Sequence, residues 1–232
     1  MIKIIFLLVM ISPIVSTLVS TSAFAFDLKT NAVHIPEAPD WLTVTRVEGI
    51  VDHIQSVMEW DIRRVQVYWY SDQRAFERMH GYGPTVLAIS RKFDNSIHIG
   101  PRVKDSNFDG VFGHELVHII SFQKYKEAIP KWLEEGLANY LGHQGKVDYT
   151  YLYKHPLPND VRDLVHPFDG SEDHIRYHYM ASQALAEMIA SKCDISDLLR
   201  LSVGRKLENY LENHCGIQNI NADYVKWIKS HK

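Results

Sequence analysis

The sequence has few cysteines, no basic cluster and no internal repeat. Its 232 residues include two cysteines, Cys193 and Cys215, which lack the C-x-x-C spacing of a redox or metal-binding thiol pair. The formal net charge is −3, and no Lys- or Arg-rich run contradicts it, which argues against nucleic acid or an anionic membrane surface as a partner. No repeat or low-complexity tract is present, so a repeat architecture is excluded.

The first 25 residues have the pattern of a secretory signal peptide. Lys3 provides a positive start, residues 4–19 are mainly apolar, and Ala23-Phe24-Ala25 is an A-x-A cleavage signal. An uncleaved membrane anchor is the alternative, but Pro13 and several Ser and Thr residues make this segment a poor membrane span. No cysteine follows it as in a lipoprotein. We therefore expect a signal peptide at 1–25, export to a bacterial periplasm, and no stable membrane insertion after cleavage.

The remaining 232 − 25 = 207 residues suit one domain at 26–232. The hydrophobic share of 46% and the charged share of 23% are ordinary for a globular protein. In an oxidising compartment an even cysteine count predicts one disulfide, Cys193–Cys215, with two buried thiols as the alternative. The sequence leaves the oligomeric state open.

The most informative stretch is residues 114–118, which read H-E-L-V-H. Residues four apart share one face of a helix, so His114 and His118 can present two imidazoles to one metal ion. Glu115 is rotated by roughly 100° and can reach a water on that metal instead. Zinc lowers the pKa of such a water towards about 7, and Glu115 would accept its proton and later hand it to the leaving amine.

A catalytic zinc site takes a third protein ligand. The metzincin continuation needs Gly and His where Ser121 and Lys124 stand, so that class is excluded. Residues 132–141 have helical spacing and offer Glu134 and Glu135. Asn139 follows Glu135 by four residues and could accept a hydrogen bond from a ligand histidine, which favours Glu135.

Residues 113–118, followed by I-P-K-W-L-E-E-G-L-A at 129–138, resemble the gluzincin metallopeptidases, and within them the small MA-like family. The resemblance covers roughly residues 60–200. It implies a thermolysin-like catalytic core, one zinc ion held by His114, His118 and Glu135, and hydrolysis of peptide bonds. Thermolysin-type enzymes carry Asp where this chain has Asn139, so we expect a neutral partner for the ligand histidine.

Two further roles follow from this resemblance. Tyr179 matches the tyrosine that opens the corresponding family helix and would donate a hydrogen bond to the oxyanion, with His178 and Tyr177 as neighbouring candidates. Ile97-His98-Ile99 would be the strand edge that pairs with an extended substrate, unless this strand is interior or covered. His174 and His178 are four residues apart, but without an acidic partner at ligand spacing an exposed helix face is the better interpretation.

The periodicity predicts an α+β fold: a short N-terminal sheet with a helix, then the zinc-site helix pair, then a mostly helical C-terminal half. Residues 27–39 are expected to be an extended lead-in. Strands are expected at 64–70, 86–90 and 96–99, the last two as a hairpin, and helices at 44–60, 71–79, 108–122, 132–141, 160–165, 179–191, 195–201, 206–214 and 221–229.

The sequence thus predicts a secreted zinc metallopeptidase acting on a peptide or protein substrate. Two alternatives stay open: a non-catalytic zinc-containing peptide-binding protein, and a zinc amidohydrolase acting on non-peptide or cell-wall amides. The intact Glu115 argues against the first, because a site that only holds zinc has no need of a base.

Overall fold

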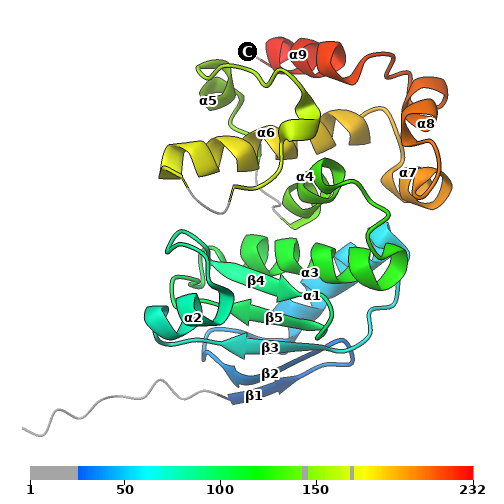
Figure 1. The fold of residues 1–232 in the computed structure, drawn as a ribbon. Coiled ribbons are helices and arrows are strands. Elements are labelled where there is room, and N and C mark those ends of the chain that lie inside the picture. Colours follow the sequence, from blue (N-terminus) through cyan, green and yellow to red (C-terminus); the bar gives the residue numbers. More distant parts are fainter. Residues whose placement is uncertain (1–25, 143–145, 168–169, 232) are drawn as a thin grey trace, which may run out of the picture.

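The computed structural model describes residues 26–142, 146–167 and 170–231 (Figure 1). The predicted signal peptide lies outside the described residues. A five-stranded sheet with three helices forms one half of the molecule, and the other half is helical. The predicted α+β class is confirmed. No helix in the described part of the chain is long and apolar enough to cross a membrane.

The sheet has the strand order β1-β2-β3-β5-β4. Its centre is parallel, since β2 pairs with β3 and β3 with β5, whereas β1 and β4 are antiparallel edge strands. The predicted hairpin between residues 86–90 and 96–99 is present as β4 and β5. The strands span Phe26–Lys29 (β1), Val33–Ala38 (β2), Val65–Trp69 (β3), Ala88–Arg91 (β4) and Ser96–Ile99 (β5).

Two sequence expectations about the sheet are wrong. The predicted lead-in contains β1 and β2, whose Leu28, Val33 and Ile35 point into the core. Ile97-His98-Ile99 form an interior strand, because β5 is hydrogen-bonded to β3 on one side and to β4 on the other. Strand β5 therefore has no backbone edge for a substrate strand, and among the described strands the edge at this end of the sheet belongs to β4.

Helices α1 (Val44–Met58) and α3 (Phe108–Tyr125) cover the same face of the sheet (Figure 1). Val47, Ile50, Val51 and Ile54 recur at helical spacing and are buried, and the Thr43 side chain caps the start of α1. Every residue of α3 from Phe112 to Ser121 is buried, so the H-E-x-x-H motif lies in the interior of the molecule. Helix α2 (Gln73–His80) packs at the end of the sheet through Phe76.

The helical half begins with α4 (Lys131–Gly142), which packs on α3 and on α6 (Glu172–Ala190). Two glycines allow the close approach of α3 and α4, because a Cβ on Gly113 would lie 2.8 Å from the Cα of Gly142.

The expected disulfide joins Cys193, just after α6, to Cys215, just after α8. The other helices are α5 (Tyr149–Tyr153), the 3-10 helix η1 (Val161–Asp163), α7 (Ile195–Ser202), α8 (Leu207–Asn213) and α9 (Ile220–Ser230).

Candidate metal site

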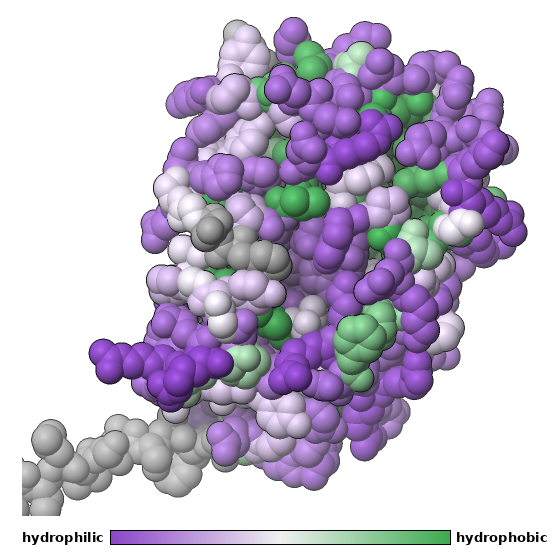
Figure 2. Space-filling view, viewed as in Figure 1, coloured by the Kyte–Doolittle hydropathy of each residue, from purple (hydrophilic) through white to green (hydrophobic). Residues whose placement is uncertain are grey.

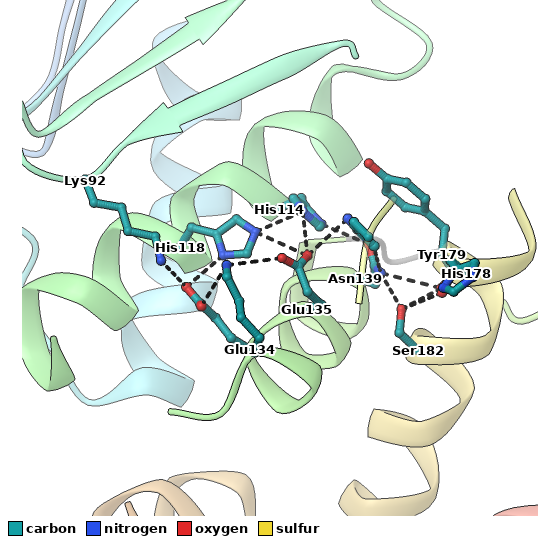
Figure 3. A network of polar contacts seen from close by, with 11 residues as sticks. Lys92, His114, His118, Glu134, Glu135, Asn139, His178, Tyr179 and Ser182 are labelled. Atoms are coloured by element: carbon teal, nitrogen blue, oxygen red, sulfur yellow. Dashed lines mark hydrogen bonds and ion pairs between the residues drawn. The ribbon is translucent and has the colours of Figure 1, made fainter. Parts of the chain in front are cut away.

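Helix α3 presents His114 and His118 from adjacent turns of its buried face. The side chains are about 5–6% exposed, and their Nε2 atoms lie 3.1 Å apart. Glu135 of α4 points at the same place: its Oε2 is 3.6 Å from Nε2 of His114 and 3.5 Å from Nε2 of His118 (Figure 3). Metal–ligand bonds of 2.0–2.1 Å in a tetrahedron separate ligand atoms by about 3.3–3.4 Å, so the three distances fit one small metal ion.

A third histidine, His166, lies beside His114 and Glu135. His166 lies in the loop after η1 and places Nδ1 at 3.0 Å from Glu135 Oε2, with its ring stacked on that of His114. His114, Glu135 and His166 offer ligand atoms that all lie within 4.8 Å of one another, and this group could hold a metal ion. No sequence pattern predicts a role for His166, because a histidine in an irregular loop has no spacing that marks it.

Each α3 histidine is oriented through its other ring nitrogen. Nδ1 of His114 is 2.9 Å from Oδ1 of Asn139, and Nδ1 of His118 is 2.9 Å from Oε1 of Glu134. The amide nitrogen of Asn139 in turn donates to Oγ of Ser182 at 2.8 Å, which fixes the orientation of the amide. The expectation of a neutral partner therefore holds for His114 only, since His118 faces a carboxylate.

These contacts imply a cation between the rings. Carboxylate and carbonyl oxygens only accept hydrogen bonds, so Nδ1 carries the proton on His114 and on His118, and both Nε2 lone pairs point at one space. Among the described residues, Oε2 of Glu135 finds no hydrogen bond of good geometry in that buried space. Three electron-rich atoms in one buried space are stable only around a proton or a metal ion.

The raised pKa of His118 also indicates that its surroundings stabilise positive charge. Burial lowers it, but Glu135 and Glu134 outweigh burial and raise the pKa to about 10. Burial would raise the pKa of Glu135, yet His118, His166 and His114 hold it well below its usual range. In contrast, burial lowers the pKa of His166 to about 4 despite the nearby Glu135, so His166 is neutral at pH 7.

Glu115 and Tyr179 flank this cluster. Glu115 is buried and accepts hydrogen bonds from the side chain and backbone of Ser90 on β4, and burial raises its pKa above the usual value. The ring of Tyr179 stacks on His166 with centroids 3.7 Å apart, and its hydroxyl points away from α6 towards the His114 side (Figure 3). Burial, then Glu115 and Glu135, raise the pKa of Tyr179, which keeps the phenol protonated at neutral pH.

Tyr179 does not open its helix as the family pattern suggested. Helix α6 begins at Glu172, where Ser171 caps it, so Tyr179 lies two turns inside. Tyr177 bonds the backbone carbonyl of Pro156. His174 and His178 have ring centroids 4.6 Å apart, and no further His, Cys, Asp or Glu in the described ranges joins them as a group of three.

A cleft of about 450 Å³ opens over the cluster. In the space-filling view the surface is hollowed between the sheet half and the helical half, with hydrophilic residues in the hollow (Figure 2). Residues 87–90, on β4 and just before it, line one wall, and α6 lines the other through Ile175, Tyr179 and Met180. His114, Glu115, His118 and Glu135 lie at its base, whereas β5 does not contribute to it.

Comparison with known proteins adds no family assignment, because no protein-family model and no curated protein matches this chain. What the structure establishes is a buried group of His and Glu side chains that could hold one metal ion.

Proposed function

We propose that this protein is a zinc-dependent peptidase of the gluzincin type. One observation carries the proposal: two imidazole nitrogens and a carboxylate oxygen lie 3.1, 3.5 and 3.6 Å from one another, at the base of an open cleft with Glu115 beside them. Three protein ligands with a fourth position open to a cleft is the arrangement of a catalytic zinc site rather than of a closed structural one.

In this proposal His114, His118 and Glu135 hold the zinc, and His166 supports them. Nε2 of His166 lies 2.8 Å from the amide nitrogen of Asn139, which can only donate, so this Nε2 accepts and Nδ1 carries the proton of the neutral ring. A protonated Nδ1 cannot bind a metal. It lies 3.0 Å from Glu135 Oε2, an electrostatic contact without hydrogen-bond geometry that favours the charged carboxylate.

Zinc held there would lower the pKa of a water molecule and polarise a substrate carbonyl. Glu115 accepts a proton from the water as the water oxygen attacks the carbonyl carbon of the substrate, and passes that proton to the amine as the C–N bond breaks. The two hydrogen bonds from Ser90 orient its carboxylate for this transfer. Tyr179, held protonated by its surroundings, donates a hydrogen bond to the oxyanion that develops on the carbonyl.

The substrate in this proposal is an extended peptide or protein segment. Among the described strands β4 pairs only with β5, and its other edge lies along the cleft. Such an edge can add a peptide strand through main-chain hydrogen bonds, with little demand on sequence. We assign the role first expected for Ile97–Ile99 to residues 87–90, because these line the cleft.

The Cys193–Cys215 disulfide fits an extracytoplasmic protein, which supports the proposed export to the periplasm.

A peptide-library digest tests the peptidase function. The protein from Phe26 onward is incubated with the library as purified, after chelator treatment, and after zinc is restored. We expect peptide cleavage that chelation abolishes and zinc restores. Tight zinc binding without cleavage would support the peptide-binding alternative, and cleavage confined to non-peptide amides would support the amidohydrolase.

A further inference from the structure

Glu134 contacts the side of His118 that faces away from the proposed zinc. Its Oε1 is 2.9 Å from Nδ1 of His118, whereas Nε2 of that ring faces Glu135 (Figure 3). Glu134 is 5% exposed, so its carboxylate has left water almost completely. A buried carboxylate is costly unless it is paired, and here the pairing is complete.

Two lysines complete the pairing from different parts of the chain. Nζ of Lys92 lies 2.9 Å from Oε1 of Glu134, the same oxygen that His118 contacts, and Nζ of Lys131 lies 3.1 Å from Oε2. Lys92 belongs to the turn between β4 and β5, on the sheet half, and its side chain is 22% exposed. Lys131 begins α4, and its side chain is 58% exposed. Lys92 is the less exposed of the two lysines, so its ion pair with Glu134 is the stronger one.

The position of Glu134 also determines which nitrogen of His118 carries the proton. A carboxylate at Nδ1 keeps the proton on that nitrogen and leaves the lone pair on Nε2, which is the only tautomer of His118 that can bind a metal alongside His114 and Glu135. A metal-bound histidine whose other N–H donates to a carboxylate is also a more basic ligand.

We propose that Glu134 is a positioning residue that holds His118 in its metal-binding tautomer, and that Lys92 acts through Glu134 by holding its carboxylate against the ring. The inference rests on the proposed function in one respect, namely that His118 is a zinc ligand. Through this chain of contacts, Lys92 on the sheet half influences the metal site by way of Glu134.

The experiment measures zinc affinity rather than turnover. Glu134→Gln is compared with Glu127→Gln, which removes the same charge from an exposed position in the loop before α4. Dissociation constants for Zn²⁺ alone are obtained by competition with a chelator. We expect Glu134→Gln to bind zinc 10- to 100-fold more weakly, the usual loss when a carboxylate behind a ligand histidine is removed, and Glu127→Gln to match the unchanged protein.

A spectroscopic signature separates positioning from general destabilisation. In the Co²⁺-substituted protein each ligand histidine should give one exchangeable, strongly shifted Nδ1–H proton signal. Glu134→Gln should move or lose the signal of His118 and keep that of His114, whereas Asn139→Ala should do the reverse. Identical signals and equal zinc affinity in Glu134→Gln and the unchanged protein would overturn the inference.

Lys92→Met supplies a second variant that leaves the histidine and both glutamates in place. Alone it should weaken zinc binding by less than Glu134→Gln does. In the Glu134→Gln background it should have no further effect, because Lys92 acts only through that carboxylate. Independent, additive losses would overturn the role given to Lys92. A protein that binds zinc in this Glu134-dependent way but cleaves no peptide would refute the proposed function and leave the inference standing.

Discussion

At the scale of single residues, the site is defined by which atom each side chain presents. Glu134 and Glu135 are neighbours on α4, yet one contacts Nδ1 of His118 and the other faces Nε2. In the sequence, Glu135 is favoured over Glu134 by the spacing of Asn139 and by the family resemblance. The structure brings Asn139 to His114, and it shows Glu134 in a position that spacing could not indicate.

Zinc stoichiometry should distinguish the two glutamates. Glu135→Ala removes a proposed ligand and should abolish stoichiometric zinc binding, because two histidines alone leave the site incomplete. Glu134→Ala should still bind one equivalent, with weaker affinity. Metal analysis after dialysis against a fixed free-zinc concentration measures both, and the reverse order would show that the ligand is Glu134.

Tyr179 should contribute to the transition state and little to ground-state binding. Tyr179→Phe removes a hydrogen bond that strengthens only as charge develops on the oxyanion, so kcat should fall about 10²- to 10³-fold with KM nearly unchanged. Tyr177→Phe is the matched control, since Tyr177 bonds the carbonyl of Pro156. If Tyr177→Phe or His178→Ala shows the loss and Tyr179→Phe does not, the donor is a neighbour on α6.

At the scale of elements, local patterns were predictable and pairings were not. The buried face of α3 and the start of α4 follow from apolar periodicity, and the structure confirms both helices. Ile97–Ile99 were predicted as an edge, but strand order depends on which distant segments pair, and β3 occupies that side. His166 reaches the site from a loop, so no local pattern could reveal it.

The crossing of α3 and α4 should be intolerant of any side chain. A Cβ on Gly113 would meet the Cα of Gly142 at 2.8 Å, which forces the helices apart. We expect Gly113→Ala to lower the free energy of unfolding by about 1–3 kcal/mol, as overpacked cores do. Denaturant unfolding of both proteins measures this change in the free energy of unfolding.

Gly49→Ala is the matched control for the helix crossing. Gly49 is exposed within α1, and its Cβ would have no heavy atom within 4 Å. Alanine there should raise the free energy of unfolding by about 0.5–1 kcal/mol, since it favours the helix. Equal effects of the two substitutions would contradict the tight crossing.

At the scale of the whole molecule, the site lies where the two halves meet. The sheet half contributes β4 and α3, and the helical half contributes α4, α6 and the His166 loop. The sequence predicted this division, including the helix pair, because the motif and its glutamate lie on consecutive helices. The strands β1 and β2 were not predicted, since both are short and β2 contains Pro36, which weakens the periodicity.

The disulfide should stabilise the helical half without serving the site. Cys193–Cys215 closes a loop of 22 residues, and neither cysteine lines the cleft. Replacing both cysteines by serine should lower the free energy of unfolding by about 3 kcal/mol and lower Tm. Activity at moderate temperature should survive. Calorimetry and a peptide assay on the same sample check this, and loss of activity in a folded variant would link the disulfide to the site. Two free thiols in exported protein, seen by alkylation and mass spectrometry, would contradict the pairing.

The most direct test of the central claim is a paired measurement of zinc content and peptide hydrolysis in Glu115→Gln. Glu115 is proposed as the base and not as a ligand, so this variant should bind one zinc with the affinity of the unchanged protein and lose peptide hydrolysis by several orders of magnitude. Hydrolysis retained in zinc-loaded Glu115→Gln would contradict the proposed peptidase.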